Sequence, residues 1–311
     1  MSKIDFKVAT RAFAQARAQQ RAPDFTRFES SVWTTAADRM VQAGDLEGAA
    51  LAVRWMRQAW PALEWARNVD RLLQLMPPPD PAAPPFADNS SAGVQTVHRP
   101  GAETTLLVFC GANQRVGMPL PMLHRWLSRF PVSLIYLRDL KSLGYLNGIE
   151  PLGQDLAGTL AGLRRRLAEL GTRRTVCYGP SFGGYGALRY GLELGVGAVV
   201  LMSGLINMEA AFNEGLHYTR TARRMQAAFP EEILDLRELY LASPKPPVVF
   251  AAYAEHNWDD RIHAEHLIGL EGVVPIQAPG ARTHNTTMEL MRTGRFDDLI
   301  RQAIEVGHEA H

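Results

Sequence analysis

The chain has 311 residues, of which 46% are hydrophobic and 21% charged, a balance typical of a globular protein and not of a disordered one. Its 33 basic and 32 acidic residues give a net charge of +1, so no broad positive field exists for nucleic acid or an anionic membrane, and we expect neither as a partner. No apolar run approaches the roughly 18–20 residues of a membrane span. The N-terminal segment lacks the apolar stretch of a secretory signal, which predicts a cytoplasmic protein.

Residues 1–75 are rich in Ala, Leu, Arg, Gln and Met and contain no strand-like run, which predicts a small all-helical region. Part of it resembles a single tetratricopeptide-repeat hairpin, with small residues where two helices approach, a glycine at the turn and a proline after the second helix. These positions are Trp33, Ala37, Gly44, Ala49 and Pro61. No second copy follows at a period of about 34 residues, so an ordinary helical hairpin is the alternative.

The same region carries Trp33, Trp55 and Trp60, a large apolar content for a short hairpin. We expect this surface to be covered either by the rest of the chain or by a second copy, and a homodimer through these helices is the hypothesis that follows.

Residues 76–92 separate this region from the rest of the chain. Six prolines lie between positions 77 and 85, and such a segment can neither continue a helix nor form a strand. We therefore expect a proline-rich linker over 76–92 and a second domain over 93–311.

In that second domain, short β-branched or apolar runs alternate with amphipathic stretches, which predicts an α/β fold with a mostly parallel sheet covered by helices on both faces. The expected strands are 105–110, 132–137, 174–178, 196–202, 247–253 and 273–277. The expected helices are 119–129, 152–170, 183–194, 260–269 and 286–305. Residues 205–246 are too long for one crossover, so we expect a helical, cap-like insertion whose apolar side chains shape the pocket. These are Ile206, Met208, Phe212, Met225 and Phe229.

The chain has two cysteines, too few for a disulfide scaffold. Both Cys110 and Cys177 lie in apolar, strand-like runs, and we expect them to be buried as small hydrophobic side chains.

The pattern G-x-S-x-G occurs at 179–183, around Ser181. A buried strand is expected before it and a helix after it, and such a corner forces the serine into a strained conformation with its Oγ projecting from the sheet edge. A side chain at Gly179 or Gly183 would collide across the tight turn. The pattern therefore predicts a nucleophile elbow.

With this elbow, residues 93–308 resemble the α/β-hydrolase superfamily, whose chain order is oxyanion loop, nucleophile, acid and histidine. The resemblance implies two backbone N–H donors for the oxyanion hole. One is Phe182, directly after the nucleophile, and the other is Ala112 in the loop after strand 105–110, with Asn113 as the neighbouring candidate.

The same chain order implies that the base is a histidine after the last strand, where His284 stands. The acid is expected after the preceding strand, in a segment with three carboxylates. Asp260 is favoured because it is the last loop residue or the N-cap of the next helix, with Asp259 second and Glu255 third.

Other polar groups in the sequence have less specific interpretations. His256, His263 and His266 have helical spacing, but no thiolates accompany them, so we expect no metal and no cofactor. Arg138 and Asp139 follow a strand and are either pocket residues or a structural salt bridge.

The function that follows is a serine hydrolase that cleaves a small-molecule carboxylic ester or thioester through an acyl-enzyme on Ser181. An acyltransferase with the same triad is the first alternative. A binding or scaffold protein that kept the fold is the second.

Overall fold

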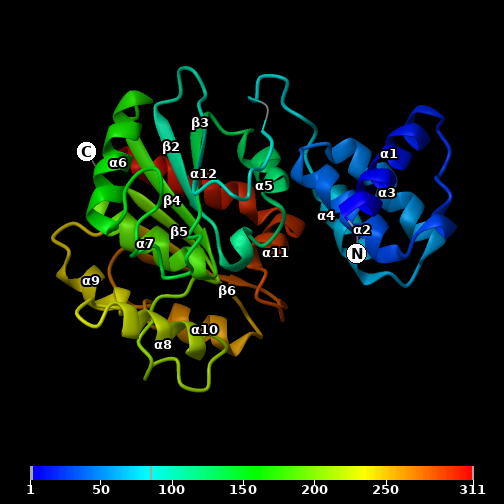
Figure 1. Cartoon of the computed structure of the whole chain (residues 1–311). Helices are drawn as coiled ribbons and strands as arrows, with labels where there is room; N and C mark the ends of the chain where they lie inside the picture. The colour runs from blue at the N-terminus through cyan, green and yellow to red at the C-terminus, as the bar shows by residue number, and fades with distance from the viewer. Residues whose placement is uncertain (1–2, 85, 310–311) are drawn as a thin grey trace. The chain divides into compact units, whose positions relative to one another are not determined.

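The computed structural model describes residues 3–84 and 86–309 (Figure 1), and the chain divides into two compact units. The helical unit consists of Met1–Asn89 and Met118–Arg129, and the sheet unit consists of Ser90–Gly117 and Phe130–His311.

The helical unit is built from α-helices and one 3₁₀ turn. They are α1 (Lys3–Ala18), η1 (Phe25–Arg27), α2 (Ser30–Gln42), α3 (Leu46–Ala59), α4 (Glu64–Leu75) and α5 (Leu120–Leu127). The hairpin of α2 and α3 has the features that the sequence suggested. Ala37 and Ala49 are fully buried, and Gly44 turns the chain at φ +81°, a conformation in which a side chain is strained.

Trp33 is the centre of an aromatic cluster in this unit and is fully buried. Its ring centroid lies 5.0 Å from those of Phe13 and Phe25 and 5.8 Å from that of Phe28, all in edge-on contacts, and Phe25 also lies 5.0 Å from Trp60. The unit therefore covers Trp33 from within, without a second copy. The homodimer stays a prediction.

The helical unit also includes segments that the sequence assigned elsewhere. Helix α5 was expected in the second domain, yet it packs on α2, its His124 ring stacks on Phe86 at 4.6 Å, and Arg125 forms an ion pair with Glu47 at 2.5 Å. The proline-rich segment contributes too, since the N–H of Asp88 donates to the carbonyl of Gln42 at 3.0 Å. An apolar helix pattern predicts burial but does not indicate which unit provides the cover.

The sheet unit contains seven strands in the order β1-β3-β2-β4-β5-β6-β7. They are β1 (Val94–Val97), β2 (Thr104–Phe109), β3 (Val132–Leu137), β4 (Arg174–Pro180), β5 (Ala198–Met202), β6 (Val248–Ala254) and β7 (Val273–Ala278). All neighbours pair in parallel except β1, which pairs antiparallel to β3. The sequence analysis missed β1, which has four residues and is only partly buried. The predicted parallel sheet is confirmed.

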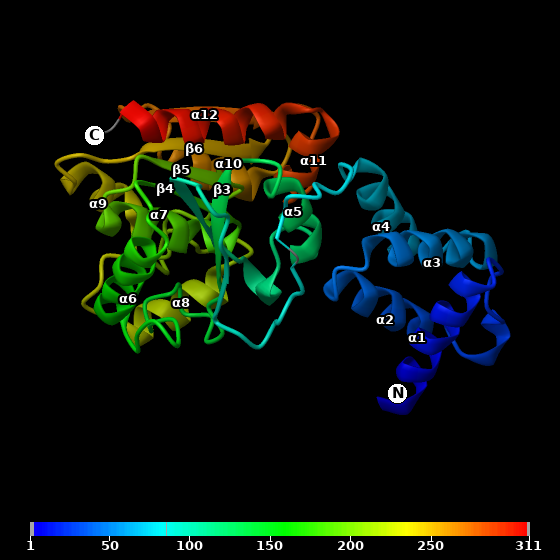
Figure 2. The ribbon, with the colours of Figure 1, turned by 90° about the horizontal axis from the view of Figure 1, so that it is seen from above.

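Helices cover both faces of this sheet, as Figure 2 shows, with α12 on one face and α6 and α7 on the other. They are α6 (Leu156–Glu169), α7 (Phe182–Leu194), α10 (Trp258–Glu265), α11 (Thr286–Arg292) and α12 (Arg295–Glu309). Every residue of β2, β3 and β5 is buried, as parallel strands between two helix layers require. Cys110 and Cys177 are buried, as predicted.

The insertion between β5 and β6 contains α8 (Thr219–Ala228) and α9 (Leu236–Ala242). A bridge between Asn207 and Asp235 joins its start to the segment before α9. Residues of this insertion reach the ends of the strands where Ser181 lies.

Replacing Trp33 by Ala should destabilise the helical unit by about 3–5 kcal/mol, because a fully buried indole is lost and the aromatic cluster cannot close the cavity. The matched control is Trp258→Ala, since that indole is 59% exposed and its loss should change stability by less than about 1 kcal/mol. Native-state hydrogen exchange of the amides in α1–α4 measures both. Equal protection in the two variants would contradict the assigned core.

Candidate active site

Ser181 stands at the corner between β4 and α7, at φ 53° and ψ −127°. This conformation costs about 1–3 kcal/mol for a residue with a side chain, so the surroundings must impose it. The N–H of Ser181 donates to the carbonyl of Met202 at 3.0 Å, and the carbonyl of Ser181 accepts from the N–H groups of Gly184 at 2.9 Å and Leu205 at 3.0 Å. The backbone is thus held from α7 and from the end of β5.

The two glycines of the pattern allow this corner to pack closely. A Cβ on Gly179 would lie 2.2 Å from the carbonyl oxygen of Gly183, and a Cβ on Gly183 would lie 2.2 Å from the carbonyl oxygen of Phe109. The second contact is with β2 and not within the turn itself. Glycine at 183 therefore lets the corner sit directly on the neighbouring strand.

The loop after β2 approaches Ser181 at Gly111. A Cβ on Gly111 would lie 3.5 Å from the Cβ of Ser181 and 3.0 Å from the carbonyl oxygen of Pro180. The next residue, Ala112, opens a 3₁₀ turn that extends over Asn113 to Gln114. Among the described residues, the backbone N–H groups of Ala112 and Phe182 have no hydrogen-bond acceptor.

His284 lies in the loop after β7, two residues before α11, and its side chain is 34% exposed. Its Nδ1 donates a short hydrogen bond to Oδ1 of Asp260, whose side chain is fully buried. A carboxylate can only accept here, so Nδ1 carries a proton, and in the neutral ring Nε2 is left as an acceptor.

Asp260 differs in one respect from the expectation. The N-cap of α10 is Asn257, whose Oδ1 accepts from the N–H of Asp260 at 3.2 Å, so Asp260 stands in the first helical turn and is not the cap. The Asn257 side chain takes the capping role that we expected of Asp260. The Asp260 side chain is thereby free to face His284.

The two alternative acids have other partners. Oδ2 of Asp259 accepts from the backbone N–H of His217 at 3.3 Å, and Oε2 of Glu255 accepts from the N–H of Gly280 at 2.6 Å. Neither forms a hydrogen bond with His284 in the described part of the chain.

Ser203 is a site residue that the sequence analysis missed. It follows β5, has φ 49°, and its Oγ donates to Oδ2 of Asp260 at 2.5 Å. Because that proton is used, the hydroxyl of Thr286 donates to Ser203 Oγ at 3.1 Å. Both oxygens of the buried carboxylate are thus hydrogen-bonded, as a buried charge requires. The available signal was a polar residue directly after a buried strand, followed by Gly204.

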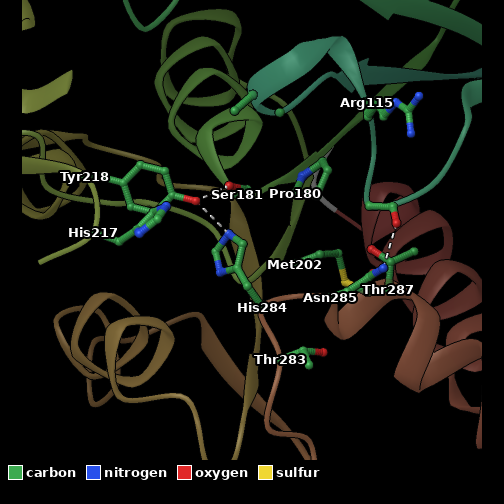
Figure 3. Close-up of a pocket in the computed structure, with 13 residues that line it drawn as sticks. Arg115, Pro180, Ser181, Met202, His217, Tyr218, Thr283, His284, Asn285 and Thr287 are labelled. Atoms are coloured by element: carbon green, nitrogen blue, oxygen red, sulfur yellow. Dashed lines mark hydrogen bonds between the residues drawn. The ribbon is translucent and has the colours of Figure 1, made fainter. Parts of the chain in front are cut away.

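Tyr218 is the second residue that the sequence analysis missed. Its hydroxyl lies 2.9 Å from Oγ of Ser181 and 3.0 Å from Nε2 of His284, so it stands between them (Figure 3). The described residues show no direct hydrogen bond between Ser181 and His284. Burial raises the pKa of the Tyr218 phenol, and the negative charges of Asp260 and Asp259 raise it further. The hydrogen bond with Ser181 lowers this pKa and partly offsets the rise.

Ser181, Tyr218 and His284 line a cleft of about 510 Å³. Its lining consists of Gly111, Ala112, Arg115, Gly117, Pro180, Ser181, Met202, His217, Tyr218, Thr283, His284, Asn285 and Thr287. No carboxylate is among them. The insertion contributes only His217 and Tyr218, which corrects the expectation about its apolar side chains.

Those apolar side chains instead fix the insertion to the sheet unit. Ile206, Met208 and Met225 are buried in its hydrophobic core and Phe229 packs against that core. The ring of Phe212 lies 5.3 Å from that of His263 and 4.9 Å from that of His266. The insertion must pack its apolar side chains into the core of the sheet unit before it can supply a pocket wall, and composition does not separate these two roles.

The histidines on and after α10 are structural. Nδ1 of His263 accepts from the N–H of Ile206 at 3.2 Å, and Nε2 of His266 bonds both oxygens of Asp235 at 2.8 and 2.9 Å. No group of three or more His, Cys, Asp or Glu side chains suited to a metal ion occurs in residues 3–84 and 86–309.

Arg138 and Asp139 stay outside the cleft. Arg138 donates to the carbonyl of Ala92 and to the side chain of Gln95, while Asp139 accepts from the N–H groups of Leu143 and Tyr145. They organise the chain after β3 and do not form the salt bridge with each other.

Comparisons with known proteins show the fold. No protein-family model and no curated protein sequence matches the chain. Among solved structures, esterase B from Lactobacillus rhamnosis, inhibited by a tributyrin phosphonate, aligns with a TM-score of 0.53 at 11% identity over 83% of this chain and 96% of that chain. An esterase of the bacterial hormone-sensitive lipase family gives 0.48 at 14% identity over 88% and 99%. The capsule O-acetyltransferase of Neisseria meningitidis serogroup A gives 0.48 at 16% over 70% and 94%.

The sheet order and the alignment with esterase B together define the class of protein: the chain has the α/β-hydrolase fold, preceded by a helical region. The resemblance drawn from the sequence is confirmed at this level. No described helix is long and apolar enough to cross a membrane.

His263 should make the folded state sensitive to acid. Its side chain is 1% exposed, and burial, assisted by the nearby His266 and His284, lowers its pKa from 6.5 to about 4 against the opposing charges of Asp260 and Asp235. The unfolded chain therefore binds this proton more readily. Neutral, buried His263 thus contributes up to about 3 kcal/mol to the free energy of unfolding. This contribution is complete above pH 6.5 and is lost as the pH falls toward 4.

The variant His263→Asn keeps an acceptor for the N–H of Ile206 but cannot titrate, so its stability should fall less steeply between pH 6.5 and 4. Denaturant unfolding at several pH values measures this. The control His256→Asn removes a half-exposed imidazole, so its slope shows what the loss of a surface histidine alone does. Identical slopes in all three proteins would show that His263 does not carry the effect.

Proposed function

We propose that the protein is a serine hydrolase that cleaves a small carboxylic ester, or a thioester, through an acyl-enzyme on Ser181. The observation that carries this proposal is one continuous chain of hydrogen bonds at the cleft. It runs from the buried carboxylate of Asp260 through both ring nitrogens of His284 and the hydroxyl of Tyr218 to Oγ of Ser181. Nucleophilic acyl transfer requires a serine hydroxyl polarised toward an imidazole, and a carboxylate must orient that imidazole.

Each residue has a role that its contacts support. Oγ of Ser181 attacks the acyl carbonyl carbon, and its proton passes to Nε2 of His284. Asp260 keeps the proton on Nδ1 and stabilises the imidazolium that forms. The imidazolium then protonates the leaving group, and a water molecule activated in the same way releases the acid.

The developing oxyanion requires donors that have no other acceptor. Phe182 is the first residue of α7, and Ala112 is the first residue of the 3₁₀ turn beside Ser181. Both lack an acceptor among the described residues, so they are free to bind the tetrahedral intermediate, and the positive end of α7 favours negative charge there.

Ser181→Ala should abolish ester hydrolysis and leave the protein folded. The nucleophile is lost, which lowers kcat by several orders of magnitude, while the corner that contains it is held by backbone contacts that alanine keeps. Hydrolysis of p-nitrophenyl acetate and covalent labelling by a fluorophosphonate probe measure the loss.

The same labelling experiment separates the alternatives. A folded wild-type protein that the probe does not label would favour a binding or scaffold protein, and activity retained by Ser181→Ala would end the present assignment. Product analysis with added alcohol or amine acceptors distinguishes hydrolysis from acyl transfer, because an acyltransferase yields the acylated acceptor in preference to the free acid.

The identity of the acid gives a second test. Asp260→Asn keeps the shape but allows the amide to stabilise the wrong tautomer of His284, so kcat should fall by roughly 10²–10⁴. The control Asp259→Asn alters a carboxylate that bonds the backbone of His217 and should reduce kcat by less than about tenfold. Steady-state kinetics of both variants decide it, and the reverse order of effects would assign the acid to Asp259.

A further inference from the structure

The cleft contains a hydroxyl between the proposed nucleophile and the proposed base. Oγ of Ser181 and Nε2 of His284 each bond the phenol of Tyr218, at 2.9 and 3.0 Å. In the neutral imidazole Nε2 carries no proton, so the phenol donates to it and the hydroxyl of Ser181 donates to the phenol oxygen. All three bonds therefore run in one direction, from Ser181 toward Asp260.

Tyr218 is held firmly in this position. It precedes α8, and the hydroxyl of Thr219 donates to the carbonyl of Leu216 at 2.7 Å. The N–H of His217 bonds Asp259, and the fully buried Asn213 donates to the carbonyls of Asn207 and Glu209, both at 2.9 Å. These contacts anchor the backbone on both sides of Tyr218, so the phenol is a built part of the site.

We propose that Tyr218 is a further catalytic residue, a proton relay between Ser181 and His284. This inference rests on the proposed function and deepens it. As Oγ of Ser181 attacks the carbonyl carbon, its O–H bond breaks and the proton bonds to the phenol oxygen. In the same step the phenol O–H bond breaks and that proton bonds to Nε2. The phenol is neutral before and after, the imidazole becomes imidazolium, and the substrate carbonyl oxygen takes the negative charge. When the tetrahedral intermediate collapses, the bond from the carbonyl carbon to the leaving group breaks. The imidazolium proton then passes through the phenol to the leaving oxygen or sulfur.

The electrostatics of the phenol agree with such a concerted transfer. Burial raises its pKa, and the neighbouring carboxylates of Asp260 and Asp259 act in the same direction. A free tyrosinate is therefore disfavoured, and the phenol keeps a proton to donate over the pH range in which imidazole acts as a base.

The competing explanation is that the phenol fills the space of a leaving group or a water molecule and must move away before reaction. The two explanations predict opposite effects of Tyr218→Phe, which deletes only the hydroxyl. A relay predicts that acylation slows by about 10²–10⁴-fold with little change in KM, because the proton loses its path. A space-filling phenol predicts acylation that is unchanged or faster.

The experiment measures the acylation burst of the full chain with p-nitrophenyl acetate and its rate of labelling by a fluorophosphonate. Tyr240→Phe is the control, since it also deletes a phenol oxygen hydrogen-bonded in the sheet unit, at the carbonyls of Pro247 and Glu271, away from the cleft. It should react at the wild-type rate. Circular dichroism checks that both variants fold.

A second readout needs no variant. In mixtures of H₂O and D₂O, two protons moving together in the wild-type acylation step give a curved dependence of rate on deuterium fraction, whereas one proton gives a straight line. A curved dependence with a slow Tyr218→Phe supports the relay. A straight line, or an equally fast Tyr218→Phe in a wild-type protein that labels at Ser181, overturns the relay alone. A wild-type protein that does not label overturns the proposed function and the relay with it.

Discussion

The geometry of the site depends on the backbone of Ser181, which is held in a conformation that a residue with a side chain does not adopt by itself. Three elements impose it. Helix α7 and the end of β5 bond its peptide groups, and the close approach of Gly183 to the carbonyl of Phe109 seats the corner on β2. The strain at Ser181 is local, but the contacts that hold it come from the packed sheet. The position of Oγ therefore depends on the pairing register of β2, β4 and β5.

The second determinant of the site is a buried negative charge. Asp260 is 3% exposed and is stabilised by the imidazole of His284 and the hydroxyl of Ser203, while Asn257 satisfies the helix terminus beside it. Because each oxygen of this carboxylate is hydrogen-bonded, its orientation is fixed, and it in turn orients the ring of His284. The residues that support the chemistry thus come from the ends of β5, β6 and β7, which a parallel sheet brings to one edge.

The sequence predicted the elements whose patterns are strong and local. Six parallel strands were placed within two or three residues of their bounds, and the strand–serine–helix corner was recognised from a pattern of five residues. The partly buried β1 gave too weak a pattern, and the neighbours of α5 depend on contacts that are distant in sequence. Tyr218 and Ser203 contact Ser181 and Asp260, which lie 37 and 57 residues away in sequence, and a local pattern does not specify such distant contacts. Their roles are set by the tertiary fold of the insertion and the sheet edge.

The division of the chain has a consequence for how the protein is made. Because α5 belongs to the helical unit but lies between β2 and β3 in sequence, the polypeptide passes from one unit to the other three times. During synthesis on the ribosome, α1–α4 emerge roughly forty residues before the helix that completes their unit. The last piece of the helical unit is thus synthesised only after β1 and β2 of the sheet unit, so the helical unit is not one continuous segment of the chain.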